Sequence, residues 1–162
     1  MTGLEVRRIR PAEHEAAGDV CVAAYDPLLT GAEDDYRDRL RDVATRDAQA
    51  EVWVAALDDR VVGVVTYCPP GSPWREIGRE DEGEFRMLAV HPAAQGSGAG
   101  TALARLCEKR AREDGATGMA LSSLKTMAAA HRVYSRLGYS RDPGRDWSPV
   151  AGVDLLAFHK SF

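Results

Sequence analysis

The 162-residue sequence has few cysteines and no long hydrophobic run. Its three cysteines, Cys21, Cys68 and Cys107, are odd in number and far apart, which argues against a disulfide framework and against the ligand spacing of a zinc site. No apolar stretch approaches the roughly 20 residues that span a bilayer. The charged N-terminus lacks the apolar segment of a signal peptide. We therefore expect a cytoplasmic protein without a membrane partner and without a metal site.

An excess of positive charge is also missing. The 21 basic residues stand against 25 acidic ones, and the formal net charge is -4. The strongly basic surface of a nucleic-acid-binding protein is therefore not expected. The apolar share of 44% and the charged share of 28% are typical of globular proteins, and the length is that of one domain. We expect a single domain over residues 1–162.

Hydrophobic periodicity predicts an alternation of strands and helices along the chain. Strands are expected near residues 4–9 and over residues 52–57, 61–67, 85–90, 119–124 and 153–158. Helices are expected over residues 11–25, 33–46, 99–115 and 127–137. The pair 52–57 and 61–67 is joined by Asp58-Asp59-Arg60, which is typical of a hairpin.

The order of these elements predicts the fold class. The helix between strands 85–90 and 119–124 is long enough to cross over the sheet, so these two strands can lie parallel. The hairpin before them is antiparallel, and the sheet is therefore expected to be mixed. The sequence predicts a layered α/β (or α+β) fold, with a twisted mixed sheet and helices on both of its faces.

Glycines gather in one segment, Gln95-Gly96-Ser97-Gly98-Ala99-Gly100, between a predicted strand and a predicted helix. Glycines at such a place let backbone N–H groups surround a phosphate, and the helix N-terminus adds a favourable dipole. No lysine follows Gly98, which disfavours a Walker loop, and the glycines follow the fourth strand, which disfavours a dinucleotide fold. A plain glycine-rich turn is the structural alternative.

Three segments together resemble the GNAT superfamily of acyl-CoA-dependent N-acyltransferases. They are Met87-Leu88-Ala89-Val90-His91-Pro92, the glycine loop, and Ala130-His131-Arg132-Val133-Tyr134-Ser135-Arg136-Leu137-Gly138-Tyr139. The element order fits that family over nearly the whole chain. The resemblance implies a single-domain GNAT-like fold, acetyl-CoA as co-substrate without a metal, and an amine acceptor, with a homodimer as one allowed assembly.

The resemblance also implies which residues bind acetyl-CoA. The strand before the glycine loop carries a bulge in this family, and its backbone binds the pantetheine arm and the thioester carbonyl. A bulge leaves backbone groups unpaired, so that they can face an oxygen that gains charge in the reaction. The implied cofactor-binding residues are Leu88, Ala89 and Val90 on the strand, and Gln95, Gly96, Ser97, Gly98, Ala99, Gly100 and Thr101 around the pyrophosphate.

Two residues receive catalytic roles by the same resemblance. Tyr134 occupies the position of the general acid that protonates the departing thiolate, and its structural alternative is a core tyrosine. Glu84 is the candidate general base, and its alternative is an exposed glutamate at a strand edge. A second base position of some relatives corresponds to Ser122, which cannot accept the proton. His131 lies one turn before Tyr134 and either relays a proton or is simply packed.

The resulting hypothesis is an N-acetyltransferase that moves an acetyl group from acetyl-CoA to a primary amine of a small molecule or peptide by direct attack. The alternative is a noncatalytic acyl-CoA-binding sensor or regulatory module. A nucleotide-binding domain is the third and weakest interpretation.

Acidic clusters lie in two segments that are expected to border the acceptor. They are Glu33, Asp34 and Asp35 in one, and Glu76, Glu80, Asp81, Glu82 and Glu84 in the other. If these carboxylates face the cleft, they attract a cationic amine and disfavour a carboxylate-bearing acceptor. Trp74, Trp147 and Tyr25 are candidates for apolar walls. Ordinary solvated loop charge is the alternative.

Overall fold

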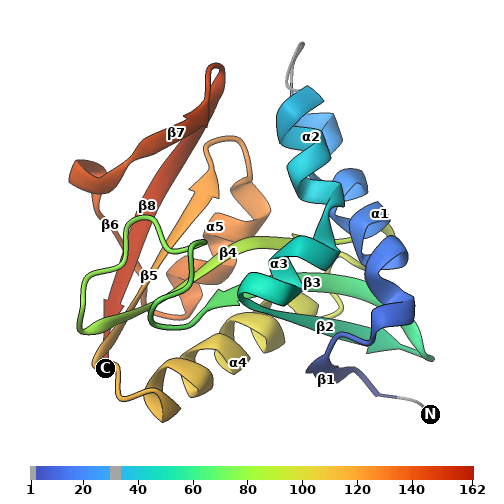
Figure 1. Ribbon diagram of the computed structural model, residues 1–162, viewed down its shortest axis with the longest axis horizontal. Helices are drawn as coiled ribbons and strands as arrows, with labels where there is room; N and C mark the ends of the chain where they lie inside the picture. Colours follow the sequence, from blue (N-terminus) through green and yellow to red (C-terminus); the bar gives the residue numbers. More distant parts are fainter. Residues whose placement is uncertain (1–2, 30–33) are drawn as a thin grey trace.

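The computed structural model describes residues 3–29 and 34–162. Within these ranges the strands form one eight-stranded sheet (Figure 1). In chain order the strands are β1 Glu5–Arg8, β2 Glu51–Leu57, β3 Arg60–Cys68, β4 Glu82–Val90, β5 Gly118–Leu124, β6 Ser140–Arg141, β7 Trp147–Val150 and β8 Val153–Ser161.

Five α-helices accompany the sheet in the same part of the chain. They are α1 His14–Tyr25, α2 Asp34–Arg41, α3 Val43–Gln49, α4 Ala99–Glu113 and α5 Ala128–Arg136. Short 3-10 turns lie at Pro11–Glu13, Asp26–Leu28, Pro92–Ala94 and Pro143–Arg145. None of the helices described is both long and apolar enough to cross a membrane.

The sheet is mixed, as the sequence predicts. Its strand order is β1-β2-β3-β4-β5-β8-β6, and β7 pairs with β8. The neighbouring strands run antiparallel except for β4 and β5, which are parallel. A parallel pair needs a crossover of about a dozen residues or more, and the connection through α4 provides it.

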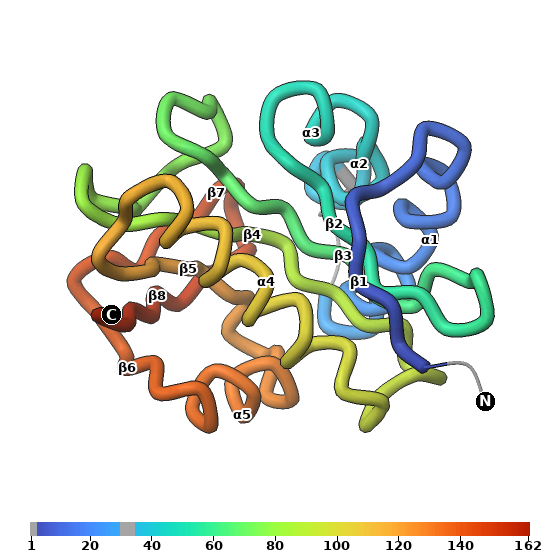
Figure 2. Tube along the Cα trace, turned by 90° about the horizontal axis from the view of Figure 1, so that it is seen from below, coloured from blue at the N-terminus to red at the C-terminus, as the bar shows by residue number. Residues whose placement is uncertain are grey.

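Helices cover both faces of the sheet and create two cores. On one face α1 and α3 pack against β2, β3 and β4, α2 packs against α1, and Leu40 and Val54 are fully buried in the core between these elements. On the other face α4 packs with Leu103 and Cys107 against Phe85 of β4. In Figure 1 α4 lies below the strands, and Figure 2, seen from below, has α4 in front of them.

The predicted helix over residues 33–46 is divided in the structure into α2 and α3. Asp42 separates them with a non-helical backbone (φ -81°, ψ 67°), and its carboxylate accepts a hydrogen bond from the Thr45 N–H at 3.2 Å. The prediction of one continuous helix was therefore wrong, because Asp42 acts as a helix N-cap. Glu33 and the side chain of Asp34 lie outside the described residues.

The hairpin between β2 and β3 is confirmed. Its two turn residues, Asp58 and Asp59, have φ angles of 50° and 61°. Positive φ at both positions is the geometry of a type I′ turn, which matches the twist of the flanking strands.

The C-terminal end of the sheet contains a strand that the periodicity did not predict. β7 is short and carries Pro149, which lacks the N–H that a sheet ladder requires. It pairs with β8 through Trp147 and Leu155. This closing hairpin places Trp147 near the loop that precedes β4, where it borders a cavity described below.

Candidate active site

The parallel strands β4 and β5 separate halfway along their length. Their pairing begins at Glu82 with Gly118 and ends at Phe85 with Leu121. Beyond this point β4 continues beside β3, and β5 continues beside β8 (Figure 1). The two strands therefore form a V-shaped opening, and the edge of β4 that faces it has no strand partner among the described residues.

A β-bulge lies on β4 at this opening. Val65 of β3 faces two residues of β4, Met87 and Leu88, and the pairing register shifts there. Met87 has a φ of 55°, which is uncommon for a residue other than glycine. The Tyr25 hydroxyl of α1 donates to the Leu88 carbonyl at 3.2 Å. The bulge thus includes Leu88, the first of the three residues that the resemblance implies, whereas Ala89 and Val90 remain paired with Val64 and Gly63 of β3.

The glycine loop leads from the end of β4 into α4. Gly96 and Gly98 have φ angles of 83° and 88°, and a Cβ at either position would meet no atom within 4 Å. Gly98 is the N-cap of α4, and the Ala99 N–H donates to Ser97 Oγ at 3.3 Å. The first N–H groups of a helix have no acceptor within the helix. The loop therefore presents open space beside backbone donors, which suits an anion.

A cavity of about 580 Å³ connects the glycine loop with the opening between the strands. Its walls come from the end of α1, β4, the glycine loop and α5. Representative lining residues are Leu28, Val90, Gly98, Ala130 and Val133. The volume lies within the range of about 300–1,000 Å³ that small-molecule sites occupy.

Tyr134 of α5 is buried, with 2% of its surface exposed. Its ring lies 6.0 Å from Phe85, 6.0 Å from Tyr139 and 5.5 Å from Phe158, measured between centroids. Burial raises the pKa of Tyr134, while the nearby hydroxyl of Ser123 opposes the shift. The phenol is therefore protonated at neutral pH and carries a proton that it could donate, as the predicted general acid requires.

His131 fastens α5 to the end of β5. Its Nε2 lies 3.1 Å from the carbonyl oxygen of Leu124, so the neutral ring donates through Nε2. Burial lowers the pKa of His131, and the Arg141 guanidinium adds to the shift. The ring centroid of His131 lies 6.4 Å from that of Tyr134. Of the two predicted roles, this hydrogen bond supports the packed histidine.

A second cavity of about 340 Å³ lies on the side of β4 that α2 and α3 cover. It is bordered by these helices, by the loop that precedes β4, and by β7. Its lining residues are Arg39, Gln49, Pro73, Trp74, Glu76, Arg86, Trp147 and Pro149. Of the two acidic segments that the sequence analysis places beside the acceptor, the one that precedes β4 borders this cavity, through Glu76.

Comparison of the sequence with models of known families identifies the family to which this arrangement belongs. The model described as "Acetyltransferase (GNAT) family" matches residues 17–139, which is more than half of the chain. The chain belongs to the GNAT acetyltransferase family. The resemblance that the glycine loop and the tyrosine helix carry is thereby confirmed.

Solved structures share the GNAT fold over nearly their whole length. A GNAT-family protein from Desulfovibrio desulfuricans is 22% identical, with a TM-score of 0.70 and coverage of 98% of this chain and 99% of that one. YncA from Salmonella typhimurium, solved with its cofactor acetyl-CoA, is 22% identical (TM-score 0.65; 98% and 94% covered). PaiA N-acetyltransferase from Thermoplasma acidophilum, in complex with coenzyme A, is 12% identical (TM-score 0.70; 99% and 99%). No curated protein is similar enough to count as a match.

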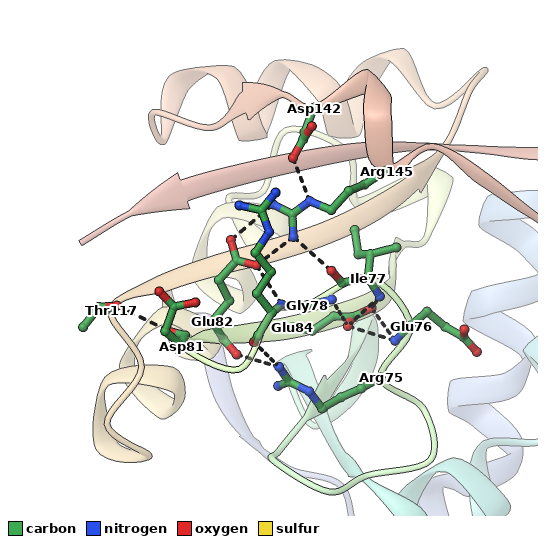
Figure 3. A network of polar contacts seen from close by, with 11 residues as sticks. Arg75, Glu76, Ile77, Gly78, Asp81, Glu82, Glu84, Thr117, Asp142 and Arg145 are labelled. Carbon is green, nitrogen blue, oxygen red and sulfur yellow. Dashed lines mark hydrogen bonds and ion pairs between the residues drawn. The ribbon is translucent and has the colours of Figure 1, made fainter.

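Glu84, the predicted general base of this GNAT protein, is fully buried on β4 and holds the preceding loop (Figure 3). Its Oε1 accepts the backbone N–H groups of Glu76 at 3.0 Å, Ile77 at 3.2 Å and Gly78 at 2.8 Å. Burial raises the pKa of Glu84, whereas these amides and the Arg86 guanidinium oppose the shift. Its role as a base stays a prediction, and its alternative as an exposed strand-edge residue was wrong.

Carboxylates do not gather at the acceptor side in the way that the sequence suggested. Glu82 forms an ion pair with Arg145 at 2.7 Å (Figure 3). Glu84 is enclosed by backbone amides, so among the predicted acidic residues that the structure describes, Glu76 alone lines the second cavity. The expectation of an acidic acceptor site was therefore wrong for Glu82 and Glu84, because their charges have partners within the protein.

Sequence reasoning missed Arg86, which lines the second cavity and is only 5% exposed. The available signal was its place between Phe85 and Met87 in an otherwise apolar strand. A charged group at a buried strand position needs dedicated partners. Such a residue is therefore a candidate for a site even when no motif includes it.

Proposed function

We propose that this GNAT protein is an N-acetyltransferase that moves an acetyl group from acetyl-CoA to a primary amine by direct attack. The observation that carries the proposal is the single cavity that joins the split of β4 and β5 to the glycine loop. The proposed domain spans residues 1–162, and the proposed location is the cytosol. A homodimer stays a prediction.

The residues around the cavity fit acetyl-CoA. Residues 95–101 would hold the pyrophosphate, because Gly96 and Gly98 leave room beside the donors at the start of α4. The backbone of residues 88–90 would hold the pantetheine arm and the thioester carbonyl. The hydroxyl of Ser122, on β5 beyond the split, is buried and has no hydrogen-bond partner in the described ranges.

Proton transfers would fall to two side chains. Bound acetyl-CoA supplies a thioester whose carbonyl carbon is attacked by the amine nitrogen, so that a C–N bond forms and the C–S bond breaks. Tyr134 would donate its hydroxyl proton to the sulfur that leaves. Glu84 would accept, directly or through water, the proton that the attacking amine loses.

The cysteines support direct attack rather than a covalent enzyme intermediate. Cys21, Cys68 and Cys107 are all buried, and burial raises the pKa of each thiol. The thiolate is the nucleophilic form of cysteine. None of the three is therefore suited to take the acetyl group from acetyl-CoA.

A noncatalytic acyl-CoA-binding module is the second candidate. The observation in its favour is the Glu84 carboxylate, which already accepts three backbone N–H groups. Both candidates require that acetyl-CoA binds, whereas a nucleotide-binding domain requires that ATP or NAD competes with it. Calorimetric titration with acetyl-CoA, repeated in the presence of ATP or NAD, tests this requirement. A folded sample that does not bind millimolar acetyl-CoA would overturn both candidates.

A further inference from the structure

The second cavity carries a positive charge where an acidic site was expected, and it borders the strand that leads to the reaction site. Two arginines, Arg39 and Arg86, line it together with one glutamate, Glu76, and of these three Arg86 is buried. Opposite charges attract more strongly where burial limits screening by water. A ligand with an anionic group is therefore favoured at this cavity over a ligand with only cationic groups.

Arg86 is held in a fixed position by its neighbours. Its guanidinium carbon lies 5.6 Å from the ring centroid of Trp74 and 5.1 Å from that of Trp147. One of its nitrogens, Nη1, donates to the Trp74 carbonyl at 3.2 Å. Ion pairs within 4.0 Å link many arginines of the described chain to carboxylates, but none links Arg86. The Glu84 carboxylate acts on Arg86 from beyond this distance and accepts backbone N–H groups instead. A guanidinium that stacks on aromatic rings keeps N–H donors at its edge. Two such donors side by side can bind the two oxygens of a carboxylate.

Trp147 supplies a second, independent observation. Its indole Nε1 is buried and has no hydrogen-bond acceptor among the described residues. The indole nitrogen is a donor only, so an acceptor oxygen is what it lacks. Trp147 lines the same cavity as Arg86 and stacks on its guanidinium, so the unpaired N–H and the cation belong to neighbouring side chains at this cavity.

The spacing along β4 suits a short acceptor molecule. Arg86 precedes Leu88 by two residues, and Leu88 lines the larger cavity at the bulge. At about 3.3 Å per residue, their Cα atoms are separated by at most about 7 Å. An acceptor that places one end at Arg86 would extend along β4 toward Leu88 to bring its amine to the opening.

We propose that the amine acceptor also carries a carboxylate, as a free amino acid does, and that Arg86 binds this carboxylate together with the Nε1–H of Trp147. This inference rests on the proposed function and names its substrate class. The rings of Trp74 and Trp147 form apolar walls for the rest of the acceptor. The electrostatic expectation of a purely cationic acceptor is thereby replaced by that of an anionic group beside the amine.

The test compares free amino acids with the matching amino-acid amides as acceptors. The amide keeps the amine and the side chain but lacks the negative charge. We expect the KM of the best acid to be at least about 10-fold lower than the KM of its amide. Arg86→Gln should remove this difference, whereas Arg86→Lys, which keeps the charge without the fork of donors, should retain part of it.

Two controls separate binding from folding. Arg105→Gln removes an exposed arginine from α4 and should leave both KM values unchanged. Glu76→Gln removes the carboxylate of the cavity and should leave acid acceptors bound as well as before or better, whereas a cation-selecting site would lose affinity. Melting curves confirm that each variant folds.

The outcomes distinguish this inference from the proposed function. Equal KM values for acid and amide, or a preference for amides or polyamines, would overturn the inference and leave the acetyltransferase proposal standing. If no amine is acetylated, the amino acids are titrated into the protein saturated with coenzyme A, and their binding is measured instead. Binding to the wild-type protein that is lost in Arg86→Gln supports the inference. Absence of binding to the wild-type protein overturns it. Absence of acetyl-CoA binding would overturn the proposed function itself.

Discussion

At the level of single residues, burial decides which chemistry Tyr134 can perform. A phenol with an ordinary pKa near 10 remains a weak acid until it is placed beside the atom that needs its proton. The aromatic rings around Tyr134 raise its pKa by excluding water and also fix its direction. The role proposed for this hydroxyl therefore depends on its position beside the bound thioester and not on its acidity.

Substitution of Tyr134 by phenylalanine tests that role, because it removes only the hydroxyl. We expect kcat to fall by roughly 100-fold or more, and the Kd of acetyl-CoA to change no more than a few-fold. Since burial raises the pKa of Tyr134, kcat of the wild type should not decline on the alkaline side below about pH 10. An unchanged kcat in Tyr134→Phe would show that water or another group protonates the thiolate.

Glu84→Gln tests the structural contribution of the buried carboxylate. Glutamine replaces one acceptor oxygen by an N–H donor that faces the backbone N–H groups of the loop. We expect the free energy of unfolding to fall by about 1–3 kcal/mol, measured by denaturant titration. Glu80→Gln changes the net charge equally in the same loop, at an exposed position, and should have almost no effect. An equal loss in both variants would contradict the contacts described for Glu84.

The raised pKa of Glu84 also predicts how the stability of the wild-type protein changes with pH. Because burial raises the pKa of Glu84 above its ordinary value, the unfolded chain releases this proton at a lower pH than the folded protein does. Wild-type stability should therefore fall as pH rises from the ordinary glutamate pKa through the raised one. Glu84→Gln should lack this slope.

At the level of elements, β4 organises the site because each half of it has a different neighbour. Its first half pairs with β5 and carries Glu84, and its second half, beyond the bulge, faces the larger cavity. Arg86 lies between these halves and borders the second cavity. One strand thus connects the proposed base, the proposed acceptor site and the proposed cofactor site.

The glycine loop can be tested with a matched pair of glycines from the two ends of α4. Gly98 and Gly115 have φ angles of 88° and 85°, and a Cβ at either meets no atom within 4 Å. Aspartate causes similar backbone strain at both, but only at Gly98 does it place a negative charge at the proposed pyrophosphate site. We expect Gly98→Asp to weaken acetyl-CoA binding by about 100-fold or more in calorimetry, and Gly115→Asp to bind normally. Normal acetyl-CoA binding by Gly98→Asp would show that the pyrophosphate does not bind at this loop.

The sequence predicted helices and strands well where hydrophobic periodicity was strong. It predicted them poorly where a single side chain determines whether an element continues or ends. The stripe of Tyr36, Leu40 and Val43 is buried as its spacing indicated. The break at Asp42 was missed because aspartate is tolerated inside helices, and only its hydrogen bond to the Thr45 N–H reveals the cap. β7 was missed because Pro149 lowers the strand signal.

For the whole molecule, the fold and the place of the glycine loop between β4 and α4 could be predicted because local signals and chain order specify them. The acceptor side could not, since its character depends on which charges are neutralised by distant residues. Glu82 is paired with Arg145 across 63 positions of sequence, and Arg86 is brought beside Trp147 by the closing hairpin. No count of charges in a segment contains this information.

The central claim is that this GNAT protein transfers acetyl groups to amines, and release of the coenzyme A thiol tests it most directly. Wild-type protein and acetyl-CoA are mixed with a panel of amino acids, amino-acid amides, polyamines and peptides, and the free thiol is followed over time. We predict release that depends on the amine, exceeds hydrolysis without amine, and falls by roughly 100-fold in Tyr134→Phe. Acetyl-CoA binding without amine-dependent release across the whole panel would contradict the claim and favour a noncatalytic acyl-CoA-binding module.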